Sequence, residues 1–137
     1  MPVPSLVNGV LPPGTYQATL SELVAAFDQL GSNTRPALNA AVRHAAALIW
    51  SRDASAIIFI NGSYVTDKRD PLDIDVAVRS YVWDDALFTA ALFAAYPGEE
   101  ALVDSYFNVQ QSQQRMEELF RQIQGRSVQK GIIQLLP

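Results

Sequence analysis

The sequence predicts an α+β or α/β-type protein: a mixed sheet of about four strands, with two leading helices and further helices packed on the sheet. Two stretches with helical periodicity come first in the chain, and short apolar runs typical of strands then alternate with amphipathic stretches. No internal repeat or linker divides the chain, and 137 residues is an ordinary size for one domain. We therefore expect a single domain over residues 1–137.

The composition excludes several classes of protein. Hydrophobic residues make up 49% and charged residues 18%, which is typical of a globular chain and not of disorder. Without cysteine there is no disulfide scaffold, cysteine metal site or cysteine nucleophile. The net charge of −4 argues against non-specific binding to nucleic acid or anionic membranes. Because no signal peptide or long apolar span is evident, we expect a cytoplasmic protein with no membrane association.

The N-terminal elements are predicted from proline, glycine and capping residues. Residues 1–18 are rich in proline and glycine and predict an extended arm that lies on the domain. Thr19 and Glu22 have the spacing of a capping box, so a helix is expected over 19–30. The later elements, in chain order, are a helix over 35–52, strands over 56–60 and 73–78, a helix over 83–96, a strand over 101–107, a helix over 112–124 and a last strand over 130–136, expected at an edge of the sheet.

Two aspartates separated by one isoleucine form the first candidate site. Residues two apart in a strand point to the same face, so Asp73 and Asp75 should project together while Ile74 points into the core. Two carboxylates on one face repel and raise each other's pKa unless a positive charge lies between them. Divalent magnesium (Mg2+) would supply that charge, and paired aspartates can bridge two such ions in enzymes that displace phosphate oxygens.

A phosphate-binding turn is expected just before these aspartates. Gly62 and Ser63 follow the apolar strand, where glycine would allow a phosphate to approach the backbone and serine would offer a hydroxyl and an amide. Lys68 and Arg69, in the loop that follows, could neutralise a triphosphate. A Gly-Ser turn alone is usually structural, and an Asp-x-Asp pair can be an ordinary solvated face. The combination of these features favours the functional interpretation.

A third carboxylate, Asp104, lies within the apolar run "LVDSYF". Burying an aspartate in the middle of a strand is costly unless it is paired or bound to a metal. We expect Asp104 to complete the metal site and to accept the proton of an attacking hydroxyl.

The segments "IFINGS", "DID" and "LVDSYF" together resemble the signature of the polymerase-beta-like nucleotidyltransferase superfamily. The beginning and end of the chain also look like a group of small bacterial nucleotidyltransferase-like proteins. The resemblance implies the nucleotidyltransferase fold, Gly62 and Ser63 as phosphate contacts, and Asp73, Asp75 and Asp104 as magnesium ligands. Two features depart from the pattern: "YVTDK" follows Gly-Ser where a second small residue is usual, and no helical domain for base or RNA recognition is present.

The resemblance implies a nucleotidyltransferase that moves a nucleoside monophosphate from a nucleoside triphosphate, with ATP as the favoured donor, to a hydroxyl group. The acceptor would be a protein or an RNA such as tRNA. Because small stand-alone members of the superfamily often work in toxin–antitoxin or phage-defence pairs, the resemblance favours a protein such as a cognate toxin, and the net charge of −4 points the same way. The alternative is a catalytically degenerate member that acts as a binding module, for instance an antitoxin.

A few other residues have less specific patterns. His44, the one histidine, predicts a surface or interface role because no catalytic partners surround it in the sequence. Trp83, Phe88 and Tyr96 predict a helix face packed in the core. Three cations near the C-terminal end predict a solvated face: Arg121, Arg126 and Lys130.

Overall fold

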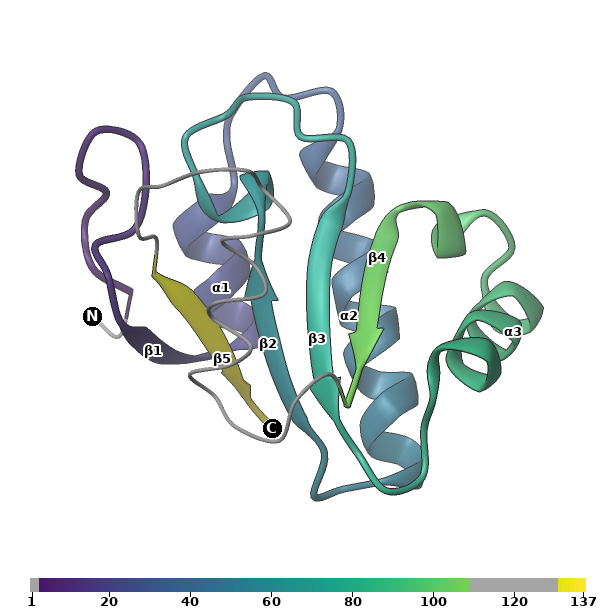
Figure 1. Ribbon diagram of the computed structural model, residues 1–137. Helices are drawn as coiled ribbons and strands as arrows, with labels where there is room; N and C mark the ends of the chain where they lie inside the picture. The colour runs from purple at the N-terminus through teal and green to yellow at the C-terminus, as the bar shows by residue number, and fades with distance from the viewer. Residues whose placement is uncertain (1–2, 109–130) are drawn as a thin grey trace.

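The computed structural model describes residues 3–108 and 131–137 and shows an α+β protein with a five-stranded mixed sheet (Figure 1). The strand order is β1-β5-β2-β3-β4. The strands are β1 (Thr15–Thr19), β2 (Ile57–Asn61), β3 (Ile74–Arg79), β4 (Val103–Phe107) and β5 (Ile132–Leu136). The α-helices are α1 (Leu20–Phe27), α2 (Arg35–Arg52) and α3 (Asp85–Ala95), with 3-10 turns at Ser63–Val65 and Glu99–Ala101.

The sheet brings the two ends of the chain together, and this corrects two predictions. The expected arm contains β1, which pairs in parallel with β5 and forms one edge of the sheet. The strand expected at an edge, β5, is therefore internal, because it also pairs antiparallel with β2. The adjacent Ile132 and Ile133 are both fully buried, as is typical of a strand covered on both faces. Outside β1, the predicted arm does lie on the domain, and Leu11 within it is 1% exposed.

Helices α1 and α2 lie behind the sheet in Figure 1 and cover one of its faces. The side chains of β2 and β3 on that face are apolar and fully buried, among them Ile58, Ile60 and Val76. The predicted capping box at Thr19 and Glu22 is confirmed: each side chain accepts a hydrogen bond from the other residue's backbone N–H. Helix α1 ends at Phe27 rather than at residue 30, because the chain turns at Asp28 into an extended conformation.

Helix α3 lies beyond β4, at the side of the sheet opposite β1 (Figure 1). Trp83 and Phe88 are buried in the core as predicted, with rings in a T-shaped contact at 6.1 Å. The prediction for Tyr96 is wrong: it is 37% exposed and stacks on His44, with ring centroids 3.7 Å apart. His44 also binds Glu99 at 2.8 Å, which makes this a surface contact between α2 and the turn after α3.

The helix predicted over 112–124 and the cations Arg121, Arg126 and Lys130 lie outside the described residues. Within the described residues, no helix is both long and apolar enough to span a membrane.

The two tryptophans provide a test of the core. The indole N–H groups of Trp83 and Trp50 each donate to a backbone carbonyl at 3.0 Å, from Trp83 to Ile49 and from Trp50 to Ala56. Trp83 is 2% exposed, whereas Trp50 is only partly buried. We expect Trp83→Phe to lower the free energy of unfolding by about 2–3 kcal/mol and Trp50→Phe by about 1 kcal/mol or less. Urea unfolding measures both, and equal losses would contradict this packing.

Candidate metal centre

The three predicted aspartates converge at one end of β3 and β4. Asp73 immediately precedes β3, Asp75 lies within it, and Asp104 is the register partner of Asp75 on the parallel strand β4. One carboxylate oxygen from each aspartate lies within 4.8 Å of one from each of the others, and all three side chains are at least partly accessible. This is the spacing that carboxylates need in order to share a cation.

The electrostatics of the cluster disfavour three unneutralised carboxylates. Burial and, to a smaller degree, the charge of Asp104 raise the pKa of Asp73, while the charge of Lys68 opposes the shift. Tyr106, two residues along β4 from Asp104, donates its hydroxyl to Asp104 Oδ2 at 2.8 Å. Burial and this hydrogen bond raise the pKa of Tyr106, so it remains a neutral donor. A divalent cation would offset both the burial of the Asp73 carboxylate and its repulsion by Asp104.

Gly62 makes room for the carboxylate of Asp75. It has a φ of 85°, and a Cβ atom built there would lie 2.1 Å from Asp75 Oδ2. No other residue type could keep both this backbone conformation and this contact. Ser63 is partly exposed and begins the short 3-10 turn Ser63–Val65. Gly62 therefore lies against the carboxylate of Asp75, and glycine has a structural reason to be there.

Arg35, at the start of α2, holds the loop that links β2 to β3. Its side chain is fully buried, and its guanidinium donates to backbone carbonyls of Phe27, Tyr64, Thr66 and Lys68. The last three belong to the loop, at distances of 2.8, 2.9 and 2.7 Å. Burial lowers the pKa of Arg35 from its ordinary value. One buried guanidinium thus fixes the path of the chain between Gly-Ser and Asp-x-Asp.

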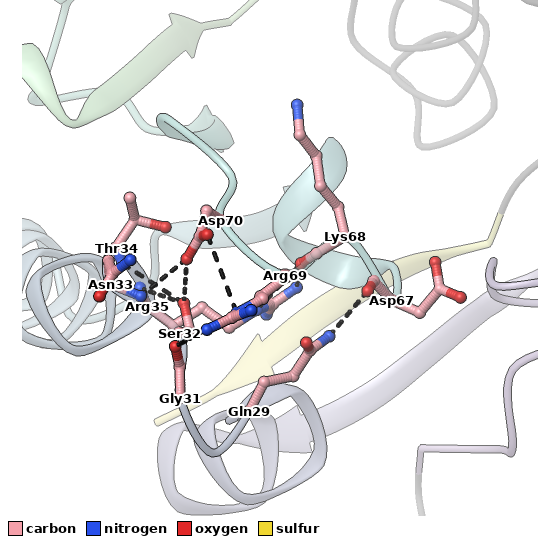
Figure 2. Close-up of polar contacts among 10 residues, drawn as sticks. All are labelled: Gln29, Gly31, Ser32, Asn33, Thr34, Arg35, Asp67, Lys68, Arg69 and Asp70. Atoms are coloured by element: carbon pink, nitrogen blue, oxygen red, sulfur yellow. Dashed lines mark hydrogen bonds and ion pairs between the residues drawn. The ribbon is translucent and has the colours of Figure 1, made fainter.

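The two cations of this loop point in different directions (Figure 2). The backbone of Lys68 is held by Arg35, while its exposed ammonium extends away from the contact network. Its opposing effect on the pKa of Asp73 indicates that its charge acts on the aspartate cluster. Arg69 instead donates twice to the carbonyl of Gly31, at 2.7 and 3.2 Å. Of the two predicted phosphate contacts, the structure leaves Lys68 available and engages Arg69 with the loop between α1 and α2.

Asp70 completes this loop contact. Its Oδ1 accepts hydrogen bonds from the Asn33 backbone N–H at 2.7 Å and from the Ser32 hydroxyl at 3.0 Å (Figure 2). The hydrogen bond from Asn33 has the largest effect in lowering the pKa of Asp70, and the one from Ser32 lowers it further, although the carboxylate is exposed.

The sequence alone does not single out three residues of this region: Arg35, Asn61 and Tyr106. In the sequence, Arg35 is an ordinary cation at the start of a predicted helix. Asn61 is a polar residue at the end of the apolar run "AIIFI", and Tyr106 follows Asp104 at a spacing of two, on the same face of the strand. Those two patterns were visible in the sequence, whereas the burial of Arg35 depends on tertiary contacts.

The chain belongs to a family described as "Family of unknown function (DUF6932)", which matches residues 4–136. Comparison with curated proteins and with solved structures finds no match.

The role of Arg35 can be tested against Arg69, since both guanidinium groups bind backbone carbonyls near the same loop. Arg35→Met would leave several buried carbonyl oxygens without a donor, so we expect a loss of at least about 3 kcal/mol in the free energy of unfolding. Arg69→Met, at a side chain that is 65% exposed, should cost less than about 1 kcal/mol. Urea unfolding of both variants measures this. A loss for Arg35→Met no larger than for Arg69→Met would refute the role assigned to Arg35.

The pKa of Asp70 predicts a dependence of stability on pH. Because its folded-state pKa is lowered, the ionised carboxylate stabilises the fold at pH values above its ordinary pKa of 3.8. That contribution is lost as the pH falls through the folded-state value. We therefore expect Asp70→Asn to be less stable than wild type near neutral pH, with the difference shrinking below about pH 4. Thermal unfolding followed across pH measures the difference, and a gap that stays constant to low pH would argue against it.

Proposed function

We propose that this protein is a magnesium-dependent nucleotidyltransferase with the nucleotidyltransferase fold. It would transfer a nucleoside monophosphate from a nucleoside triphosphate to a hydroxyl group of a protein or RNA. The observation that carries the proposal is the convergence of Asp73, Asp75 and Asp104, with ligand oxygens within 4.8 Å of one another. The Gly62-Ser63 turn beside them and the order of strand, turn and Asp-x-Asp also support it.

The donor set fits magnesium. Carboxylate oxygens are the ligands that this hard cation prefers, and it is usually held by a few carboxylates together with substrate phosphates. Asp73, Asp75 and Asp104 would hold it, and their crowding supplies the negative charge that draws a cation. When bound, magnesium neutralises the phosphate oxygens and stabilises the charge that develops on the entering and leaving oxygens.

Two residues beside the cluster are suited to the triphosphate. Ser63 follows Gly62 directly and is partly exposed, so its hydroxyl could donate to a phosphate oxygen. Lys68 carries an exposed ammonium whose charge acts on Asp73. We assign Lys68 to charge neutralisation of the phosphates. Arg69 would contribute mainly by holding the loop, because its guanidinium binds the carbonyl of Gly31.

The reaction would proceed by in-line attack of the acceptor hydroxyl on the α-phosphorus. A bond forms between the acceptor oxygen and the α-phosphorus, the bond from the α-phosphorus to the bridging oxygen breaks, and pyrophosphate leaves with the bonding pair. The acceptor proton passes to Asp104. Tyr106 donates to Oδ2 of Asp104, so Oδ1 is the oxygen we assign to this proton.

The acceptor is proposed to be a protein, such as a cognate toxin, and ATP to be the donor. The net charge of −4 favours a protein over RNA, because enzymes that modify RNA usually present a basic face to it.

Nucleotide transfer can be tested with α-labelled ATP. The protein is incubated with magnesium, the product of the neighbouring gene and total tRNA, and the label on each is measured. We expect transfer that requires magnesium and falls at least about a hundredfold in Asp75→Asn, the scale on which loss of one charge-stabilising group lowers a rate. Asp28→Asn removes the same charge from an exposed position at the end of α1 and should leave transfer unchanged.

Label on tRNA alone would overturn the assignment of a protein acceptor. Absence of transfer, together with absence of binding to any of the four nucleoside triphosphates at millimolar concentration, would overturn the enzymatic proposal. The degenerate binding module would then be the better account, and a variant with all three aspartates changed to asparagine should still neutralise its partner.

A further inference from the structure

The side-chain amide of Asn61, the last residue of β2, is buried. The residue is 2% exposed, and its Oδ1 accepts no hydrogen bond in the part of the chain that the structure describes. Buried side-chain acceptors are nearly always paired, and an exception commonly marks the place of a water molecule or an ion. Leucine has nearly the same size and would fill this position without a desolvated amide. A bound ligand at this oxygen would therefore explain why the residue is an asparagine.

The register of the sheet places this oxygen beside the aspartate cluster. Asn61 is the register partner of Asp75 on the antiparallel neighbour β3, and Asp75 is in turn the partner of Asp104 on β4. Residues directly opposite in a ladder project to the same face, so these three side chains form one row across three strands. Ile60 and Ile74, by contrast, belong to the core cluster beneath the helices. The row lies on the face of the sheet opposite that core.

The neighbouring residue reinforces this placement. Gly62 follows Asn61 and lies against the carboxylate of Asp75, so the end of β2 and the carboxylate are in direct contact. Among the described residues, one other buried side-chain oxygen has no hydrogen-bond partner, Thr34 Oγ1. Thr34 precedes α2 and lies outside this row.

We propose that Asn61 Oδ1 is a further ligand of the divalent cation held by Asp73, Asp75 and Asp104, an inference that rests on the function proposed above. Hard cations accept amide carbonyl oxygens alongside carboxylates. A neutral oxygen completes the coordination without adding a fourth negative charge to the three carboxylates that already lie close together. The cation in turn pairs an acceptor that would otherwise stay buried and unsatisfied.

Manganese, used as a spectroscopic substitute for magnesium, tests this inference without depending on catalysis. Free Mn2+ is measured by electron paramagnetic resonance during titration of wild type, Asn61→Leu, Asn61→Asp and Asp75→Asn, and urea unfolding is measured for each without metal. For Asn61→Leu we expect Mn2+ affinity to fall about tenfold. Its unfolding midpoint without metal should be equal to or higher than that of wild type, because a desolvated amide has been removed.

Asn61→Asp restores an oxygen at the same position and adds charge, so Mn2+ should bind at least as tightly as to wild type. Without metal this variant should unfold at lower urea, because a fourth carboxylate joins the cluster. A merely structural asparagine predicts a different result for Asn61→Leu, which would then destabilise the protein and leave its Mn2+ affinity unchanged. The Asp75→Asn variant should bind Mn2+ weakly or not at all, which establishes where the cation is held.

The outcomes separate the two proposals. Wild-type affinity for Mn2+ in Asn61→Leu would overturn the role of Asn61 and leave the aspartate site intact. Failure of the wild-type protein to bind Mn2+ would overturn both. If Asn61→Leu does not fold, Asn61→Asp decides the question by its affinity, and weaker binding than wild type would refute the inference.

Discussion

The candidate site depends on the hydrogen bonds that the buried guanidinium of Arg35 donates to backbone carbonyl groups. This guanidinium comes from the first turn of α2, a helix already fixed by its packing against the sheet, and it binds three carbonyl oxygens of the loop between β2 and β3. Its flat fork of donors can serve several carbonyl groups at once, which a lysine could not do. The ring of Tyr64 lies 5.2 Å from its Cζ atom and adds a cation–π contact. The loop therefore has a defined path, and this path sets the positions of the Gly-Ser turn and of Lys68.

The aspartates, in contrast, are positioned by the sheet. Register pairing of β3 with β2 and β4 aligns Asn61, Asp75 and Asp104, and alternation along the strand places Asp73 on the same face. This arrangement concentrates negative charge where the backbone leaves little freedom to relieve it. Burial, with the charge of Asp104 as a smaller contribution, raises the pKa of Asp73, and the hydrogen bond from Tyr106 to Asp104 is a partial compensation for the crowding. Crowded, accessible carboxylate oxygens can bind a cation, but their mutual repulsion lowers the stability of the fold. Proteins keep such repulsion mainly at functional sites.

Local patterns predicted most of the elements and the candidate residues. The capping box at Thr19, the bounds of α2 and the alternation of "DIDVAV" depend on neighbouring residues, and the α+β class follows from their order. The position of β5 could not be predicted in the same way, because the proline- and glycine-rich sequence around β1 indicates an extended arm, and the pairing of β1 with β5 joins distant parts of the chain. Arg35 shows the same limit: its partners lie up to 33 residues away, and no local signal marks a helix-initial arginine as buried. The separate roles of Lys68 and Arg69 likewise depend on how the loop between α1 and α2 approaches them.

The central claim is that Asp73, Asp75 and Asp104 together hold a divalent cation. The most direct measurement is a crystal structure of the protein grown with Mn2+, with diffraction data collected at the manganese absorption edge. The account predicts an anomalous peak among the three carboxylates, with an oxygen from each at a bonding distance of roughly 2.0–2.3 Å, near that of magnesium. An empty cluster in such crystals, with the three carboxylates turned apart or paired with other side chains, would contradict it.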